Sequence, residues 1–130
     1  NWLPDLTGTN TISAYEMATI LENLDQGPLV SNLTRHYGIN ILERTRNRSL
    51  LVKPLPPEVQ VAHKTGDIGT ALGDSGIFYL PDGRKYIISV QVERPFNDYT
   101  PRDMIQKASR MIYDHVLSHP GTTTIAARSQ

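Results

Sequence analysis

Lys64, Thr65 and Gly66 bring three different chemical groups into adjacent positions of the sequence. The lysine supplies an ammonium group, which lowers the cost of a nearby alkoxide or neutral amine and helps a proton to move. The threonine supplies a hydroxyl that can donate to an anionic oxygen. The glycine leaves the backbone bare, so that another chain can lie against it. A tripeptide arises easily by chance, so its meaning depends on the elements that position it.

The residues around this tripeptide predict three antiparallel strands. Residues 59–64 alternate in the manner of a β-strand, which ends in the Lys-Thr-Gly segment. A glycine-rich turn, Gly66–Gly76, leads to a second strand at Ile77–Leu80. The turn Pro81–Gly83 then leads to a third strand at Tyr86–Val92. The tripeptide is therefore expected where a strand meets a turn.

Helices are predicted before these strands. Ser13 stands three residues before Glu16, which is the capping-box pattern at a helix start. That helix is expected to end at Gly27–Pro28, and its predicted buried stripe consists of Met17, Ile20, Leu21 and Leu24. Two further short helices are predicted, Leu29–Tyr37 closed by Gly38, and Ile39–Arg46.

A long helix is predicted after the strands, with Thr100 as its cap and Pro101 in the first helical position. Gly121–Gln130 is small, polar and aperiodic, so it is predicted to be a tail that is partly disordered. The fold class is therefore α+β: an antiparallel sheet with flanking helices and a long C-terminal helix. One helix covers only one face of such a sheet, so the edges and the second face need a further partner.

Composition limits the classes of function. The 130 residues, 38% of them apolar, suffice for one small domain. Lys plus Arg and Asp plus Glu number 13 each, so no net field attracts nucleic acid or an anionic membrane. Cysteine is absent, and the four histidines show no metal-ligand spacing. We therefore expect no metal, no cofactor and no nucleic-acid partner.

The sequence resembles class A β-lactamases and penicillin-binding proteins, whose signature combines Lys-Thr-Gly with Ser-x-x-Lys and Ser-Asp-Asn. Residues 10–18 are similar to the segment and helix that leave the Ω-loop in that family, and Leu55–Pro57 is similar to the approach to its third motif. Tyr79–Gly83 resembles its hairpin turn, and the final helix resembles its C-terminal helix. The chain thus looks like the C-terminal part of a single β-lactamase-like domain, residues 1–120, followed by the tail 121–130.

The resemblance implies a role for each residue of the motif. Lys64 would assist proton transfer in the cleft, and the Thr65 hydroxyl would bind the substrate carboxylate. Gly66 would let the substrate backbone lie against the strand. The backbone N–H of Asp67 would complete an oxyanion hole with the N–H of the nucleophile.

Two more positions follow from the resemblance, each with an alternative. Asn1 falls where the family carries the Asn that holds the hydrolytic water, but an ordinary loop residue fits equally well. Ser75 stands where many class A enzymes carry an Arg that holds the substrate carboxylate. Arg46 or Arg48 could reach the cleft instead, and Arg48 is our candidate substrate-binding residue. The alternative for both is an exposed arginine at a solvated helix end.

No serine in the sequence has a lysine three residues later, and no Ser-Asp-Asn triplet occurs. The chain is therefore expected to be a cleaved or truncated piece that cannot catalyse alone. Its partner would be the missing N-terminal half or a second copy. The intact protein is expected to be a periplasmic or exported serine hydrolase that acylates on β-lactams or on peptidoglycan stem peptides. The alternatives are an inactive β-lactamase-like binding or assembly module, and an unrelated α+β domain in which the tripeptide is accidental.

Overall fold

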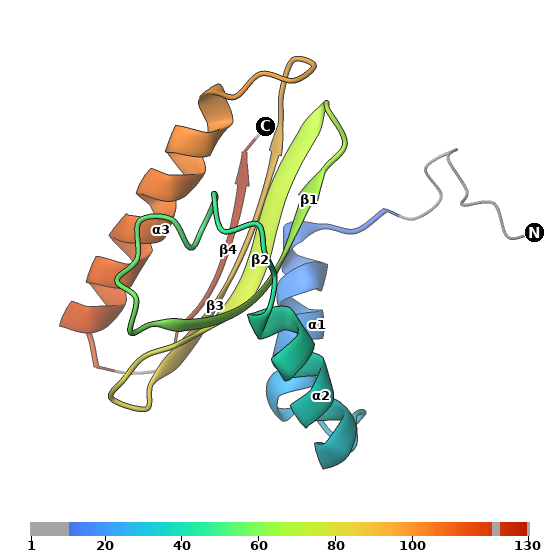
Figure 1. Ribbon diagram of the computed structural model, residues 1–130, viewed down its shortest axis with the longest axis vertical. Coiled ribbons are helices and arrows are strands. Elements are labelled where there is room, and N and C mark those ends of the chain that lie inside the picture. Colours follow the sequence, from blue (N-terminus) through green and yellow to red (C-terminus); the bar gives the residue numbers. More distant parts are fainter. Residues whose placement is uncertain (1–10, 121–122, 130) are drawn as a thin grey trace, which may run out of the picture.

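The computed structural model describes residues 11–120 and 123–129 (Figure 1). Within these ranges the chain forms helices and strands in an order that begins with two helices and continues with a meander of strands. The elements are α1 (Ala14–Gln26), α2 (Asn32–Glu43), β1 (Gln60–Asp67), β2 (Ala71–Tyr79), β3 (Lys85–Glu93), α3 (Thr100–Ser118) and β4 (Thr123–Ser129). The predicted α+β class, with an antiparallel meander and a long helix after it, is confirmed.

Helix α1 begins at the predicted capping box. Ser13 Oγ accepts from Glu16 N–H at 3.1 Å, and the Glu16 carboxylate accepts from Ser13 N–H at 2.7 Å. The buried face consists of Ala14, Ala18 and Leu21, so the predicted stripe is only partly correct. Ile20 is 53% exposed, because α1 packs on the sheet through the face that carries the small residues Ala14 and Ala18, and Ile20 lies beside that face.

Helix α2 is one continuous helix, so the prediction of two short helices separated at Gly38 is wrong. A methyl carbon at Gly38 would lie 3.2 Å from Leu24 Cδ1, which places this glycine at the close approach of α2 to α1. A glycine inside a helix costs about 1 kcal/mol relative to alanine but does not end it when packing needs the space. Gly38 is therefore a packing position rather than a helix end.

Strands β1, β2 and β3 pair antiparallel in that order. The predicted turn, Gly66–Gly76, is much shorter than expected, because pairing continues to Asp67 opposite Leu72. Gly69 occupies the turn with a φ of 84°, a conformation that side-chain-bearing residues rarely adopt. The glycines of this segment therefore lie mostly within strands, where they allow close approach of neighbouring groups.

Strand β4 corrects the prediction for the C-terminal segment. Thr123–Ser129 pairs parallel with β3, with Tyr86 opposite Thr123 and Val92 opposite Ser129. A strand can be stabilised by an open sheet edge even when its own alternation is weak, because the edge supplies the backbone hydrogen bonds. Residues 121, 122 and 130 of the predicted tail lie outside the described residues.

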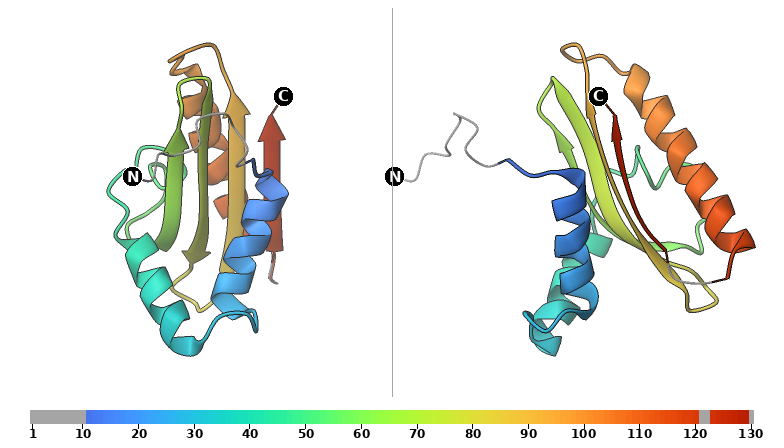
Figure 2. Two further views of the ribbon diagram at one scale, coloured as in Figure 1. Left: turned by 90° about the vertical axis from the view of Figure 1, so that its right-hand side faces the viewer. Right: turned by 180° about the vertical axis from the view of Figure 1, so that it is seen from behind.

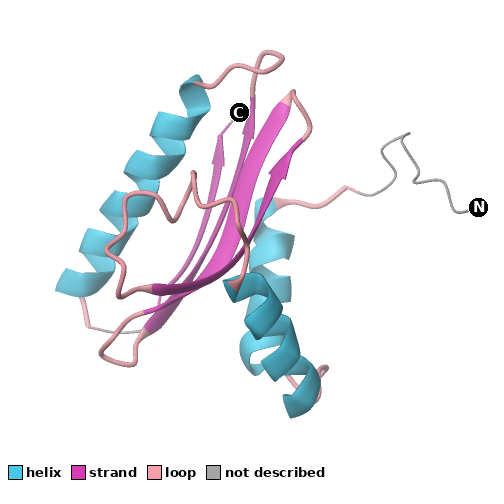
Figure 3. Ribbon diagram, viewed as in Figure 1, coloured by secondary structure: helices cyan, strands magenta, loops and turns pink. Residues whose placement is uncertain are grey.

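The sheet lies between two helical layers (Figures 1 and 2). One core cluster packs α3 on the sheet through Ile105, Tyr113 and Val116, and a second packs α1 on the other face through Ala18 and Leu21. The second face is thus covered by α1 and α2 of this same chain (Figure 3). In the described part of the chain, no helix is long and apolar enough to cross a membrane.

Helix α3 begins one residue earlier than a Thr100 cap would require, so the predicted cap is wrong by one position. Thr100 is the first helical residue, and Tyr99 in the cap position makes no side-chain capping bond. The Asp98 carboxylate takes over that role, because it accepts from both the N–H and the hydroxyl of Thr100, at 2.9 and 2.7 Å. The helix start is therefore held by the residue before the cap.

Candidate active site

The Lys-Thr-Gly segment lies at the end of β1, which is the edge strand of the sheet. Lys64 pairs with Ser75 and Gly66 pairs with Gly73 on β2. Side chains alternate along a strand, and Ala62 packs in the α1-facing core cluster. Lys64 therefore lies on the same face of the sheet as α1, as a partly solvated side chain on a hydrophobic support.

A cavity of about 260 Å³ borders this segment. Its walls come from three places: the strand end itself, the start of α1, and the facing parts of β2 and β3. The lining includes Lys64, Thr65, Gly66, Ile12, Met17 and Ser75. The predicted site residues Lys64, Thr65 and Gly66 are thus brought together at one hollow.

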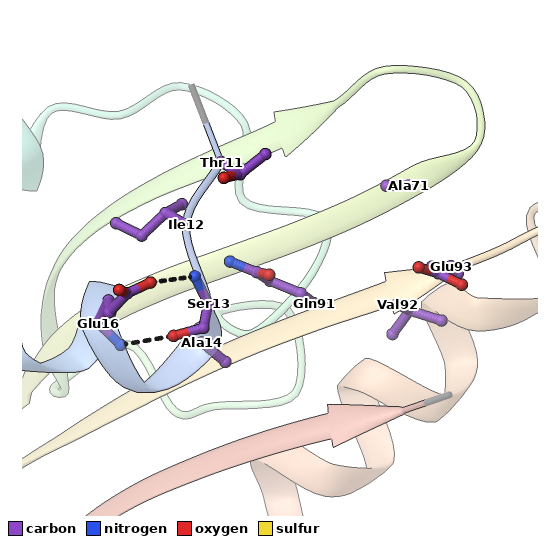
Figure 4. Close-up of a pocket in the computed structure, with 9 residues that line it drawn as sticks. All are labelled: Thr11, Ile12, Ser13, Ala14, Glu16, Ala71, Gln91, Val92 and Glu93. Atoms are coloured by element: carbon purple, nitrogen blue, oxygen red, sulfur yellow. Dashed lines mark hydrogen bonds between the residues drawn. The ribbon is translucent and has the colours of Figure 1, made fainter. Parts of the chain in front are cut away.

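A second hollow of about 460 Å³ adjoins the first and shares Ile12, Ala71 and Gln91 with it. Figure 4 shows it between the capped start of α1 and the ends of β2 and β3. The hydrogen bonds between Ser13 and Glu16 hold one wall. The two hollows together form a groove that runs from β1 across the sheet beside the first turn of α1.

The free edge of β1 exposes backbone groups of alternate residues. Ile68 N–H donates inward to Ala71 O, whereas the carbonyls of His63 and Thr65 accept from side chains, Thr45 Oγ1 and Lys64 Nζ. Backbone N–H and C=O groups alternate in direction along an antiparallel pair. The odd-numbered residues of β1 therefore direct their N–H and C=O groups to the open edge. The N–H of Asp67 falls on that side.

Arg94, at the end of β3, organises the turn that follows the motif. Its side chain is fully buried and donates to Gly69 O at 2.8 Å, to Asp98 O at 3.0 Å and to the Asp67 carboxylate. The N–H of Gly69, and next the Arg94 guanidinium, hold the pKa of the Asp67 carboxyl below its usual range. The Asp67 side chain therefore anchors the turn as a carboxylate, while its backbone stays at the strand edge.

His63 and Asp74 form a buried pair on the opposite face of the sheet from Lys64. His63 Nδ1 lies 2.9 Å from Asp74 Oδ1, and the two residues are 0% and 1% exposed. Sequence reasoning missed this pair and Arg94, because each makes contacts with residues distant in the sequence. A histidine on the apolar face of an alternating strand was the one local signal.

Ser75, which lines the cavity, is hydrogen-bonded to Ser89 on the next strand. Ser75 Oγ lies 2.8 Å from Ser89 Oγ, and both residues are buried. Ser75 lies directly opposite Lys64 on one side and opposite Ser89 on the other. A row of Lys64, Ser75 and Ser89 therefore crosses the three antiparallel strands on the α1-facing side.

The structure does not bring Arg48 to this cavity. Arg48 lines a different hollow, together with Ser49, Val52, Arg102 and Gln106, beside α3. Neither Arg46 nor Arg48 is among the residues that line the Lys64 cavity. Asn1 lies outside the described residues. In the described part of the chain, no group of three or more potential metal ligands occurs.

Three comparisons with known proteins point to the same family. Residues 1–116 match the model of the β-lactamase enzyme family. A protein from Bacteroides uniformis named β-lactamase is 32% identical over 108 residues, which cover 75% of this chain and 36% of that protein. The structure of a protein named PBP-A superposes with a TM-score of 0.81 at 36% identity, over 92% of this chain and 45% of PBP-A.

A mutant of PBP-A solved as an acyl-enzyme complex with penicillin G gives the same scores. A β-lactamase from Francisella tularensis is 16% identical with a TM-score of 0.70, over 81% of this chain and 42% of that protein, and shares the fold. The chain spans less than half the length of these relatives. The motif on its edge strand, the family match and the shared fold together establish that this chain belongs to the β-lactamase enzyme family.

Proposed function

We propose that the protein containing this chain is a serine hydrolase that forms an acyl-enzyme with β-lactams or with D-alanyl-D-alanine-type peptides. This chain supplies the Lys-Thr-Gly wall of the cleft, as the C-terminal part of a single domain. The nucleophile comes from residues outside this chain, because no serine here has a lysine three positions later. Peptidoglycan substrates would place the protein in the periplasm or outside the cell.

The observation that carries the proposal is the position of Lys-Thr-Gly on an open sheet edge beside a cavity. In the proposed reaction the substrate lies along β1 as an added strand, with its carboxylate near Thr65 Oγ1. The Asp67 N–H then donates to the developing oxyanion, a contribution typically worth about a hundredfold or more in rate. Lys64 assists the transfer of the proton away from the hydroxyl of the nucleophilic serine. Penicillin bound as an acyl-enzyme in the PBP-A mutant supports this class of substrate.

Labelling with a fluorescent penicillin tests the proposal. The full-length protein should become covalently labelled, with the label stable to denaturing electrophoresis, and excess unlabelled penicillin should compete. The isolated 130-residue chain should remain unlabelled under the same conditions. Labelling of the isolated chain, or none of the full-length protein, would contradict the proposal.

An inactive binding or assembly module is the second candidate. The observation that favours it is the absence of the Ser-x-x-Lys and Ser-Asp-Asn motifs from this sequence. Such a module would still bind a β-lactam reversibly at the cavity while forming no covalent adduct. Equilibrium binding without labelling of the full-length protein would favour this candidate.

A further inference from the structure

The hydrogen-bonded pair of His63 and Asp74 joins β1 to β2 directly behind the motif. His63 Nδ1 lies 2.9 Å from Asp74 Oδ1, and Asp74 Oδ2 accepts from the N–H of Leu51 at 3.1 Å. The carbonyl of His63 accepts from Thr45 Oγ1. The pair thus connects the two strands to the segment between α2 and β1, one residue before Lys64.

Stability alone does not explain such a pair. Replacing a buried pair by apolar residues of similar volume is often neutral or stabilising, because the charges lose their hydration. In addition, His63 Nε2 is buried without a hydrogen-bond partner among the described residues, which adds a cost. Residues that break the packing rules in this way are expected where function requires them.

The part of the β1–β2 hairpin next to the motif is rich in glycine, which has no side chain to help fix the register. Gly66, Gly69, Gly73 and Gly76 all lie within or between the two strands, and glycine-rich strands specify register weakly. A slip by two residues keeps every side chain on its own face, so the alternation of apolar and polar residues does not by itself oppose it. The same slip would separate His63 from Asp74 and leave both groups buried and unpaired.

The absence of a side chain at Gly76 leaves room for His63 on the neighbouring strand. Gly76 is the direct partner of His63, and a methyl carbon there would lie 2.7 Å from His63 Cβ. The diagonal distance to Asp74 is then short enough for the imidazole to reach the carboxylate. The His63–Asp74 hydrogen bond can therefore form only in this register of β2 against β1.

We propose that His63, through Asp74, is a positioning residue that holds Lys64, Thr65 and Gly66 in the register required for acylation. This inference rests on the proposed function of the same site. His63 faces away from the cavity and does not touch the substrate; it acts by fixing the strand that carries the motif.

Two substitutions in the full-length protein separate positioning from packing. His63→Asn places an amide nitrogen close to the position of Nδ1 and keeps the bond to Asp74. His63→Gln carries its amide one bond further, near the position of Nε2, and loses that bond. We expect labelling by fluorescent penicillin within about threefold of wild type for His63→Asn, and at least about tenfold slower for His63→Gln.

Ser109→Ala is the matched control for general destabilisation. Ser109 is fully buried beneath the same segment, where its hydroxyl donates to Leu51 O, but it makes no hydrogen bond to β1. It should lower the melting temperature while its labelling rate, measured well below that temperature, stays at the wild-type value. Equal labelling by His63→Asn and His63→Gln would overturn the inference, and so would an equal loss in Ser109→Ala.

Amide hydrogen exchange keeps the test independent of activity. In His63→Gln, but not in His63→Asn, the amides of Lys64 and Gly66, which face β2, should exchange at least about tenfold faster than in wild type. If wild type fails to react with penicillin, the proposed function is wrong, and the exchange comparison alone decides the positioning role. Unchanged exchange in His63→Gln would refute it.

Discussion

Lys64, for which we propose a chemical role, contributes hardly anything to folding. It is exposed, its ammonium donates to the carbonyl of Thr65, and the strand beneath it is held by buried neighbours such as Ala62. Removing such a side chain takes little away from the core. Lys64, which we propose to act on the substrate, is thus not one of the residues that stabilise the strand.

For Lys64→Ala in the full-length protein, we expect acylation by penicillin to slow by about 10²–10⁴-fold, the usual contribution of a group that moves a proton. The free energy of unfolding should change by no more than about 0.5 kcal/mol. Labelling kinetics and urea unfolding measure the two effects. Lys107→Ala, another exposed lysine on α3, is the control, and unchanged labelling in Lys64→Ala would remove the lysine from the mechanism.

Gly76→Ala should destabilise the protein by about 1–3 kcal/mol, because its methyl group would overlap His63 Cβ and the carbonyl of Ala62, at 2.7 and 2.9 Å. Both contacts involve the neighbouring strand, which cannot move aside easily. Urea unfolding measures the loss. Gly66→Ala, where a methyl group meets nothing within 4 Å, should keep its stability. Equal stability of the two variants would show that β1 and β2 adapt at Gly76.

Elements position these residues through contacts that cross the sequence. The end of β3 holds the turn between β1 and β2, because Arg94 binds both Gly69 O and the Asp67 carboxylate. The first turn of α1 forms one wall of the groove beside β1. The motif therefore depends on an arginine and a helix cap that are distant from it in sequence.

The turn should make stability depend on pH in the acid range. The pKa of Asp67 lies below its usual value in the folded state, owing first to the N–H of Gly69 and next to Arg94. A carboxyl with a lowered pKa stabilises the fold above the pKa it has when unfolded, and this contribution disappears as the pH falls through the folded pKa. The difference in unfolding free energy between wild type and Asp67→Asn should thus shrink on acidification. A constant difference between pH values of about 7 and 2 would contradict this.

Local patterns predicted an element best where the signal lies within that element. The capping box at Ser13 is present, and the strand predicted at residues 59–64 is present as Gln60–Asp67, although Val61, Ala62 and His63 are buried in succession rather than alternately. Gly38 and β4 could not be predicted in this way. The first depends on the approach of Leu24, and the second on the open edge of β3. The same holds for the partners Asp74 and Arg94, which meet the motif only after the sheet has formed.

At the scale of the whole molecule, α2 presents apolar side chains to solvent. Leu33, Tyr37 and Ile41 recur every four residues and are 66%, 61% and 61% exposed; we call them the outer stripe. Leu29, just before the helix, is 84% exposed. A contiguous apolar surface of this kind usually marks an interface, and this chain spans 45% of the length of PBP-A.

The isolated 130-residue chain should therefore self-associate and bind a hydrophobic dye through the outer stripe. Replacing Leu33 and Ile41 by glutamate should lower dye fluorescence and shift the chain toward the monomer, because the added charges oppose apolar contact. The helical circular dichroism should persist, since exposed substitutions change stability by about 0.5 kcal/mol or less. Met111→Glu, which removes an exposed apolar residue on α3 that is 71% exposed, is the control and should leave association unchanged. Sedimentation velocity separates the cases: a wild-type chain that is monomeric at high concentration and binds no dye would mean that the outer stripe is simply hydrated.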